Sequence, residues 1–233
     1  MGQLKVIISG GFSTSFAQLL PGFERATGIA VTTLSGASQG KGPETIAAQL
    51  SAGVEADVAI LSREGLSELI AAGAIAAGTD VDLARSGLGA AVRSGARRPD
   101  ISTVLAFKQA LLGARVVAVP ASTSGIYLTD ELFPKLGIAG KLNIRVTPRG
   151  TQSAALVAAG EADIAVQPVS ELVRAPGLDY LGEIPAELQL IQTFSAAIVR
   201  GSKEQDASKR LIAFLASESA APAIRSNGME PVN

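Results

Sequence analysis

Short apolar runs alternate with longer amphipathic stretches along this chain. The apolar runs are bounded by Gly, Pro or Ser and have the length of buried β-strands. They predict strands at residues 5–9, 29–34, 56–61, 88–93, 115–119, 144–146 and 164–167. The amphipathic stretches predict helices at residues 14–27, 43–52, 63–72, 103–113, 126–136, 152–159, 170–174, 207–216 and 220–225. Alternating strands and helices are typical of an α/β protein with mainly parallel sheets.

Capping residues mark the ends of two of these helices. Ser13 precedes the helix at residues 14–27 as its expected N-cap, and Gly28 follows it as the expected C-cap. Pro43 is expected in the first turn of the next helix, because proline is well tolerated there.

Two places depart from the regular alternation. The alternation of strand-like and helix-like stretches changes around residues 83–87. Residues 188–199 form an apolar segment longer than an ordinary strand. We expect this long segment to begin in one lobe of the protein and to end in another. The sequence has no internal repeat and no low-complexity linker. It therefore predicts two lobes joined by strand crossovers near Arg85 and Phe194.

Composition narrows the classes of function. Hydrophobic residues make up 47% of the 233 residues and charged residues 18%, so the chain can bury a large core. A formal net charge of −1, an aromatic content of 4% and the lack of Trp give no support to nucleic-acid binding. No apolar run reaches the length needed to span a bilayer.

The absence of Cys and His excludes several kinds of site. The usual zinc centres need thiolate or imidazole ligands, and no Asp-rich calcium loop is visible, so we expect no metal and no cofactor. A Ser–His or Cys–His nucleophile pair cannot be built. Acid–base chemistry would fall to Lys, Tyr or carboxylate groups, and the sequence identifies no catalytic residue.

Small polar segments follow four of the predicted strands, at residues 9–13, 35–42, 122–125 and 167–170. In open α/β sheets, ligands bind outside the carboxyl ends of the strands. Helix N-termini at this edge supply free N–H groups and partial positive charge, which suit an anion. The alternative is ordinary capping and turn formation, which uses the same residue types. The joint occurrence of four segments favours binding. The segment at residues 36–42 lacks the order of a phosphate-binding loop.

Three further side chains are candidates for the site. Lys41 lies in a loop of small residues, where its ammonium group could face an anion or simply be solvated. Arg85 could clamp a carboxylate with paired hydrogen bonds or form a salt bridge at the crossover. Tyr127 could offer its hydroxyl group to a ligand or pack within its helix. Glu161 and Asp163 are expected at a helix-to-strand turn and are not predicted to be a catalytic pair.

Four segments resemble the bacterial periplasmic solute-binding proteins of class II, in particular their molybdate-binding-like branch. They are EADVAILSREGLSELIAAG, SGLGAAVRSGARRPDIST, ASTSGIY and GEADIAVQPVSEL, in this order. The resemblance implies two Rossmann-like α/β lobes with mainly parallel sheets, joined by two crossover strands, with the ligand in the cleft. Residues 1–84 and 195–233 would then form one lobe, and residues 85–194 the other.

The resemblance also implies which residues contact the ligand. Molybdate binders hold their oxyanion with hydroxyl and main-chain N–H groups at helix starts. Ser13 and Ser38 match the loops of the first lobe, and residues 124–127 match the second. The predicted ligand contacts are Gly11, Phe12, Ser13, Ser38, Gly40, Lys41, Arg85, Ser124, Gly125, Tyr127 and Gln167. A glycine-rich first loop and the added Lys41 depart from the molybdate pattern and favour a carboxylate ligand.

The expected function is that of an extracytoplasmic receptor that closes over a small anion for ABC-type import. We expect a monomer whose partners are the anion and a membrane permease. The alternative is an isomerase of an unsaturated polycarboxylate, because this branch also resembles aconitate isomerase. In that case Lys41 or Tyr127 would act as the base, and Arg85 would stabilise the developing charge. A cytoplasmic anion sensor or storage protein is a third hypothesis.

The expected location depends on how the amino terminus is interpreted. Met1 and Gly2 lead directly into a predicted strand, without the basic and apolar regions of a secretory signal. Taken as the native start, this predicts a cytoplasmic protein. A periplasmic protein whose signal has been removed is the alternative, and it is the one that the family resemblance favours.

Overall fold

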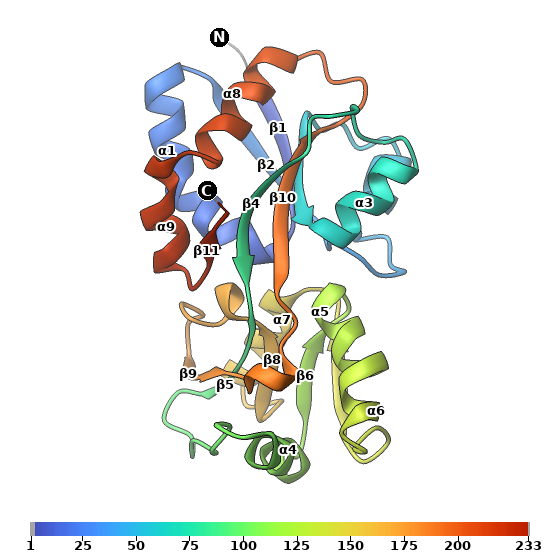
Figure 1. Ribbon diagram of the computed structural model, residues 1–233, viewed down its shortest axis with the longest axis vertical. Coiled ribbons are helices and arrows are strands. Elements are labelled where there is room, and N and C mark those ends of the chain that lie inside the picture. The colour runs from blue at the N-terminus through green and yellow to red at the C-terminus, as the bar shows by residue number, and fades with distance from the viewer. Residues whose placement is uncertain (1–2, 233) are drawn as a thin grey trace. The chain divides into compact units, whose positions relative to one another are not determined.

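The computed structural model describes residues 3–232, so the predicted start at Met1 and Gly2 lies outside the described part. The chain forms two compact units (Figure 1). Unit 1 contains the chain up to Arg85 and from Thr193 onward, and unit 2 contains Ser86–Gln192. The amino-terminal and carboxy-terminal segments therefore belong to the same unit.

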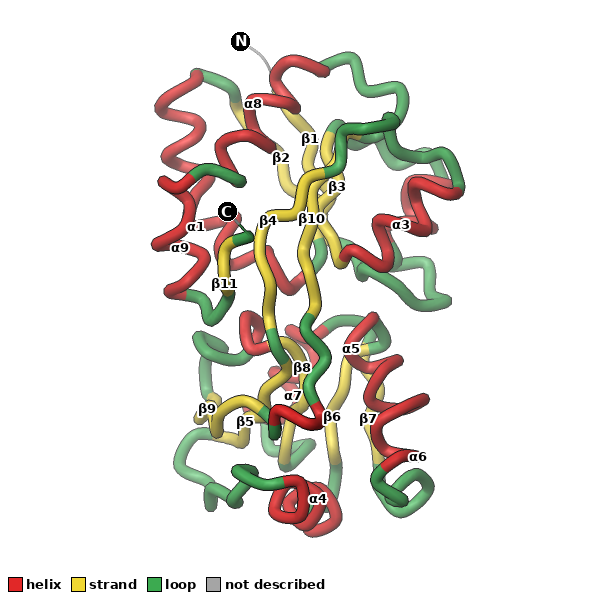
Figure 2. The backbone as a smooth tube through the Cα atoms, in the orientation of Figure 1, coloured by secondary structure: helices red, strands yellow, loops and turns green. Residues whose placement is uncertain are grey.

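Unit 1 is built on a six-stranded sheet with the order β11-β4-β10-β3-β1-β2. Its strands are β1 (Gln3–Ile8), β2 (Ala30–Ser35), β3 (Val58–Ser62), β4 (Val81–Ser86), β10 (Gln192–Ile198) and β11 (Glu230–Pro231). β1 is parallel to β2 and β3, whereas β10 is antiparallel to β3. β4 and β10 are neighbours in the sheet (Figure 2). The sheet is thus parallel at one side and mixed at the other.

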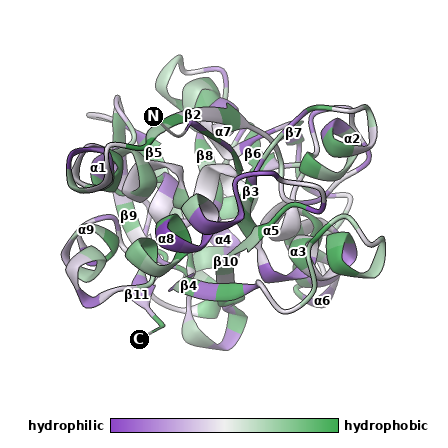
Figure 3. Ribbon diagram, turned by 90° about the horizontal axis from the view of Figure 1, so that it is seen from above, coloured by the Kyte–Doolittle hydropathy of each residue, from purple (hydrophilic) through white to green (hydrophobic). Residues whose placement is uncertain are grey.

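Helices cover this sheet because the residues of β1 alternate between two apolar clusters. Leu4, Val6 and Ile8 belong to one cluster with side chains of α1 and α8, and Ile7 belongs to a second cluster with α3. Both hydrophilic and hydrophobic residues are visible on α8 (Figure 3), whose Leu211 is fully buried. The helices of this unit are α1 (Gly10–Thr27), α2 (Ile46–Ser51), α3 (Arg63–Ala71), α8 (Gln205–Leu215), the 3-10 turn Glu218–Ala220 and α9 (Ala221–Ser226).

Unit 2 is built on a five-stranded sheet with the order β7-β6-β8-β5-β9. Its strands are β5 (Leu88–Arg93), β6 (Val117–Pro120), β7 (Ile144–Thr147), β8 (Ile164–Pro168) and β9 (Leu178–Glu183). β6 is parallel to β7 and β8, and β5 is antiparallel to β8 and β9. Its helical segments are α4 (Val104–Gly113), α5 (Thr123–Ile126), the π-helix Tyr127–Leu132, α6 (Phe133–Lys135), α7 (Gly150–Ala158) and the 3-10 turns Val169–Glu171 and Ala186–Leu188.

The predicted fold class is confirmed: the chain is an α/β protein, and both sheets contain parallel strands flanked by helices. The strand predicted at residues 88–93 has the observed bounds of β5. Gly28 is the C-cap of α1, with a φ of 71° and an N–H that donates to Glu24 O at 2.8 Å. A left-handed φ of this kind favours glycine.

Other local predictions were wrong. The helix expected after Ser13 begins at Gly10, so its N-cap is Ser9. The next helix begins at Ile46, after Thr45, instead of at Pro43. Within the long apolar segment at residues 188–199, a 3-10 turn ends at Leu188 and β10 begins at Gln192. β9 was not predicted, because its half-buried residues show neither a long apolar run nor a clean alternation.

None of the helices within residues 3–232 is long and apolar enough to cross a membrane.

Gly125 illustrates how closely the backbone approaches itself where β6 turns into α5. A Cβ atom at this position would lie 1.5 Å from the carbonyl oxygen of Pro120, so the turn as built admits only glycine. We expect Gly125→Ala to lower the free energy of unfolding by about 2 kcal/mol or more, because the backbone must shift to relieve the overlap. Urea unfolding followed by circular dichroism measures this change.

The matched control is Gly113→Ala, in the same unit. Position 113 is exposed at the end of α4, and a Cβ atom there meets nothing within 4 Å. This variant should be as stable as the wild type or more stable by up to about 1 kcal/mol, since Ala favours helix more than Gly does. Equal stability of the two variants would show that the Gly125 contact is not restrictive.

Candidate functional site

Serine residues gather at the carboxyl end of three strands of unit 1. Ser9 follows β1, Ser38 lies in the loop after β2, and Ser62 ends β3. Because β1 is parallel to β2 and β3, these strand ends meet at one edge of the sheet, which is the edge where open α/β sheets bind ligands. We call Ser9, Ser38 and Ser62 the serine edge of unit 1.

Hydrogen bonds hold the serine edge in place. Ser9 N donates to Ile60 O at 2.8 Å, which joins the end of β1 to β3. Ser62 N donates to Ser38 Oγ at 3.0 Å, and Gly65 N donates to Ser62 Oγ at 3.3 Å as an N-cap of α3. Because Ser38 Oγ accepts the bond from Ser62, the hydroxyl proton of Ser38 can be donated to a ligand.

Ser9 lies at the positive end of α1, a helix of 18 residues. Its side chain is only 3% exposed and does not cap the helix, and within residues 3–232 its Oγ has no hydrogen-bond partner. A buried hydroxyl group left without a partner costs about 1–3 kcal/mol. The first turn of α1 carries no acidic residue that would occupy its free N–H groups. These features together suit an anionic ligand at Ser9.

The other predicted residues of this first loop have different surroundings. The Phe12 side chain is fully buried in the core of unit 1. Gly11 is buried beneath Phe194, and a Cβ atom there would lie 2.0 Å from that ring. Ser13 Oγ donates to Gly10 O at 2.7 Å, so its hydroxyl proton is used within the first turn. Gly11 and Phe12 can therefore contact a ligand through their main-chain N–H groups, and the Phe12 ring is not available to it.

The two predicted cationic residues are both exposed. Lys41 follows Gly40, whose φ is 125°, and within the described residues it forms no ion pair. Arg85 lies on β4, opposite Glu230 of β11. Its positive charge contributes to a lowered pKa of Asp82.

Asp82 is the centre of a polar network in unit 1. Burial by itself would raise the pKa of this carboxyl group, but hydrogen bonds from Ser195 and Arg63 outweigh that effect, and the pKa is lowered. Ser195 Oγ donates to Asp82 Oδ1 at 2.6 Å, and Arg63 Nε donates to the same oxygen at 2.8 Å. Arg63 also pairs with Asp80 at 2.8 Å. This network links β4, β10 and α3, and its role is structural.

In unit 2, the carboxyl ends of β6, β7 and β8 meet at a second edge, because these three strands are parallel. Ser124 lies after β6 and is 1% exposed, and Gln167 near the end of β8 is fully buried. Ser170 follows β8 and is 4% exposed. Within the described chain, Ser124 Oγ, Gln167 Oε1 and Ser170 Oγ have no hydrogen-bond partner. We call Ser124, Gln167 and Ser170 the polar edge of unit 2.

The hydroxyl group of Tyr127 is already engaged. It donates to Leu188 O at 3.0 Å, and the ring packs against the core of unit 2. Burial and the charge of Glu131 raise the pKa of Tyr127. This tyrosine is therefore poorly suited to act as a base.

A carboxyl group and a guanidinium group lie at the amino-terminal end of α7. A Cβ atom at Gly150, the first residue of α7, would lie 2.2 Å from Glu171 Oε2, so the Glu171 carboxyl group lies directly against this glycine. Burial raises the pKa of Glu171 to about 7. Arg149 precedes Gly150, and its buried Nε has no hydrogen-bond partner in residues 3–232. Within the same residues, Arg149 and Glu171 form no salt bridge.

The sequence analysis did not identify Ser9, Arg149 and Glu171 as candidate site residues. Ser9 ended the first predicted strand and opened the small polar segment at residues 9–13, and like Arg149 it directly precedes a glycine that begins a helix, which could have indicated both residues. Glu171 lies in a short helical turn and is half-buried by packing against α7, which no local pattern indicates. The structure places Ser38, Gly11 and Phe12 with Ser9, and Ser124, Gly125 and Gln167 at the edge that also holds Glu171.

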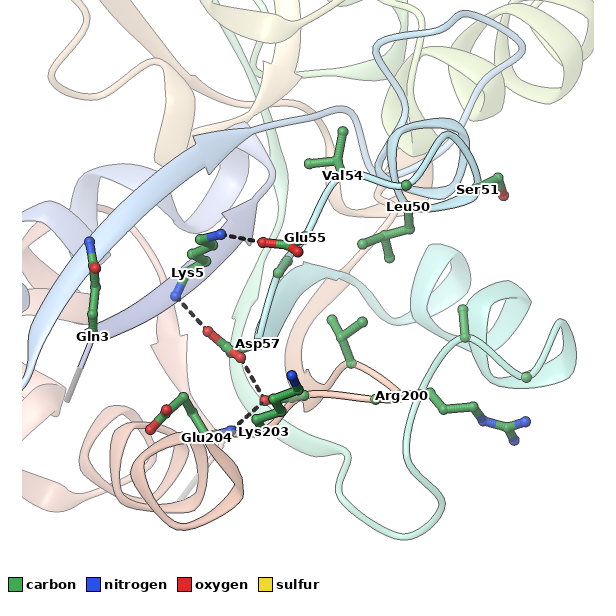
Figure 4. A pocket seen from close by; sticks show the side chains of 17 residues that line it. Gln3, Lys5, Leu50, Ser51, Val54, Glu55, Asp57, Arg200, Lys203 and Glu204 are labelled. Carbon is green, nitrogen blue, oxygen red and sulfur yellow. Dashed lines mark hydrogen bonds and ion pairs between the residues drawn. The ribbon is translucent and has the colours of Figure 1, made fainter.

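A hollow of about 630 Å³ lies at the opposite end of the sheet of unit 1, next to the first residues of β1 and β3 (Figure 4). Its lining cations Arg200 and Lys203 form no salt bridge within residues 3–232, whereas Lys5 and Asp57 are held by hydrogen bonds. Lys5 Nζ binds Glu55 at 2.5 Å, and Asp57 accepts from Lys5 N at 2.8 Å and from Ser202 Oγ at 2.6 Å. None of the predicted ligand contacts lines this hollow. Among the described residues, no group of three or more acidic side chains could hold a metal ion.

A family model described as bacterial extracellular solute-binding protein matches residues 4–230 of this chain. An aconitate isomerase from Pseudomonas sp is 38% identical over 234 residues, which cover 98% of this chain and 88% of that enzyme. These two matches extend over nearly the whole chain and both units.

Solved structures of other binding proteins share the fold. The periplasmic molybdate-binding protein of Azotobacter vinelandii has a TM-score of 0.78 and 21% identity, covering 97% of this chain and 98% of that protein. A periplasmic binding protein of A. tumefaciens R10, solved with agropinic acid, has a TM-score of 0.74 and 19% identity, covering 100% of this chain and 84% of that protein. At these identities, the likeness establishes the fold.

The raised pKa of Glu171 predicts a specific dependence of stability on pH. The folded protein keeps this proton up to about pH 7, whereas the unfolded chain releases it near the ordinary value of 4.5. Between these values the folded state binds more protons, so the free energy of unfolding falls as pH rises. Glu171→Gln should not show this loss. Between pH 4.5 and pH 8, the free energy of unfolding of the variant should therefore rise relative to that of the wild type by up to about 3 kcal/mol.

Chemical denaturation of both proteins at the two pH values measures the difference. Glu161→Gln is the matched control, since Glu161 is an exposed carboxylate just beyond the other end of α7. That variant should follow the wild type at both pH values. If the stability of Glu171→Gln also changed with pH as that of the wild type does, ionisation of Glu171 would not destabilise the folded protein.

Proposed function

The chain belongs to the bacterial extracellular solute-binding protein family, and we propose that it is a periplasmic receptor for a small anion. In this proposal the protein binds its ligand as a monomer and delivers it to the membrane permease of an ABC importer. The proposal is supported by the family match over residues 4–230 and by the fold shared with periplasmic binding proteins. It takes the polar groups at the carboxyl ends of the strands as the ligand contacts.

The observation that carries the proposal is the serine edge of unit 1. Ser9 presents a buried, unpaired hydroxyl group beside the positive end of an 18-residue helix. Ser38 has a hydroxyl proton to donate, and the N–H groups of Gly11 and Phe12 lie in the first turn of the same helix. A set made of donors, with no acidic side chain in the first turn, favours an anion over a neutral or cationic solute.

The charged residues favour a carboxylate among the anions. Arg149 at the start of α7 has a buried Nε without a partner in the described chain, and guanidinium groups bind carboxylates with paired hydrogen bonds. Lys41 and Arg85 add exposed positive charge in unit 1. The relative solved with agropinic acid supports an organic acid, whereas the relative named for molybdate supports an oxyanion. We therefore propose a small organic carboxylate as the first choice and an oxyanion as the second.

A second candidate function is isomerisation of an unsaturated polycarboxylate. It is favoured by the 38% identity to an aconitate isomerase over 98% of the chain. Such a reaction moves a proton within the substrate, and a general acid–base group works best when its pKa lies near the working pH. Glu171, with a pKa of about 7, meets this requirement better than Tyr127, whose hydroxyl group is bound to Leu188. Arg149 and Lys41 would bind the carboxylates of the substrate.

The receptor proposal predicts that one hydroxyl group matters for binding and not for folding. Ser9→Ala should weaken binding of the ligand by about tenfold or more, because hydrogen bonds to charged groups contribute about 1.5–3 kcal/mol. Its melting temperature should be unchanged or higher, since the hydroxyl has no partner within the described chain. Calorimetry with the best ligand from a thermal-shift panel of carboxylates and oxyanions measures the affinity.

Ser208→Ala is the matched control for this experiment. Ser208 Oγ is also buried without a partner in residues 3–232, but it lies in α8, outside the serine edge. This variant should bind the ligand as the wild type does. Equal affinities of the Ser9 and Ser208 variants would remove Ser9 from the site, and a panel without any anionic hit would contradict the receptor proposal itself.

The isomerase candidate makes a separate prediction. Incubation with cis- or trans-aconitate in deuterated buffer should convert one isomer to the other and introduce deuterium at a carbon next to a carboxylate, as proton NMR can measure. Glu171→Gln should lower the rate by at least about a hundredfold, the usual contribution of a general acid–base group. Binding without conversion would leave the receptor function and exclude this enzyme activity.

A further inference from the structure

Glu171 is an unusual carboxyl group for an anion-binding edge. It lies directly against Gly150 at the amino-terminal end of α7, a helix of nine residues, and the amino-terminal end of a helix favours an anion. An ionised carboxylate at this position would repel a bound anion. A neutral carboxyl group would instead donate a hydrogen bond to it. The charge of Glu171 therefore decides whether this end of α7 accepts an anion.

Buried polar atoms next to Glu171 give independent evidence for a ligand. Gln167 is fully buried, and its Nε2 donates to Glu171 O at 3.4 Å, which places its amide group beside this residue. The other atom of the same amide, Oε1, has no partner within residues 3–232. Ser170 Oγ, one residue before Glu171, is also buried and unpaired in that range. Natural proteins rarely leave such atoms unpaired unless a ligand or water completes them.

The charged residues near Glu171 do not offset the free-energy cost of ionising its carboxyl group. The helix α7 has no charged residue, and β5, which also contacts the turn of Glu171, has only Arg93 at its far end. Arg149 lies before α7 but makes no salt bridge with Glu171 within the described chain. Arg174, three residues after Glu171, has an interaction of its own. Burial is the cause of the raised pKa, without a contribution from a neighbouring charge.

We propose that Glu171 is a specificity-determining residue that binds the anion as a neutral acid, so that ligand binding takes up a proton. The inference rests on the proposed function of anion binding. The proton comes from solvent and bonds to a carboxyl oxygen of Glu171, and no bond of the ligand forms or breaks. Arg149 and the N–H groups of α7 supply the positive field, and the protonated carboxyl group supplies one further donor. The site then selects ligand groups that carry only acceptor atoms, such as a carboxylate or a fully ionised oxyanion.

The proposal gives a measurable dependence of affinity on pH. With a Glu171 pKa of about 7, a complex that requires the protonated form should bind about tenfold more weakly at pH 8 than at pH 6. At pH 8, binding should take up close to one proton per anion, and at pH 6 only a small fraction of one. Calorimetry in two buffers with different ionisation enthalpies measures this uptake. Molybdate, sulfate and trans-aconitate are suitable probes, because each stays ionised over this range.

Two variants separate the role of Glu171 from general effects of pH. Glu171→Gln keeps a neutral donor of the same shape, so it should bind the probe with an affinity that changes less than twofold between pH 6 and pH 8, without proton uptake. Glu161→Gln, which removes an exposed carboxylate beyond the other end of α7, should behave as the wild type does. A carbon NMR titration of Glu171 in the wild type gives its pKa with and without the probe, and the probe should raise it.

Each outcome decides the question. Proton uptake that is lost in Glu171→Gln and kept in Glu161→Gln supports the proposal. Binding without proton uptake, or uptake that persists in Glu171→Gln, overturns it and leaves the receptor function intact. If neither these probes nor any other carboxylate or oxyanion of the thermal-shift panel binds at any pH, the proposed function fails, and the role of Glu171 fails with it.

Discussion

Parallel pairing of the central strands is the constraint on which both candidate edges depend. β1 is parallel to β2 and β3, and β6 is parallel to β7 and β8, so each strand must pass into its following segment at the same edge of its sheet. The turns at that edge need small residues and capping groups, and these groups expose main-chain donors. Residues far apart in the sequence are thereby collected at one place. The chemistry of each edge then depends on the few polar side chains whose hydrogen-bonding groups are not needed to form the turns.

The two edges use different electrostatic means. In unit 1, neutral hydroxyl and N–H groups lie at the start of α1, and the carboxylate of Asp82 is paired with the cation Arg63 and accepts a hydrogen bond from Ser195. In unit 2, a carboxyl group and a guanidinium group lie at the start of α7 without pairing with each other in the described chain. The first arrangement uses hydroxyl and N–H groups that carry no charge, whereas the second contains a carboxyl group whose pKa burial raises to about 7.

Sequence patterns were sufficient for the fold class and most elements, because apolar periodicity reports burial directly. They failed at the start of α1, where Ser13 was predicted as the N-cap in place of Ser9, because two glycines normally interrupt a helix. Here Gly11 is required by the ring of Phe194, which is distant in the sequence. The ligand contacts inferred from the family, such as Ser38 and Ser124, remain predictions. Glu171 could not be recognised from sequence, because its pKa depends on packing against a helix that begins 21 residues earlier.

The order of strands in unit 1 has a consequence for how the protein is made. β10 (Gln192–Ile198) lies between β4 and β3 in the middle of the sheet, although it is among the last segments to be synthesised. A nascent chain that has completed unit 2 still lacks this interior strand, so β3 and β4 cannot join into one sheet. Folding of unit 1 is therefore delayed until synthesis is nearly finished. If the protein is the periplasmic receptor proposed above, such a delay would keep its polypeptide unfolded and competent for export.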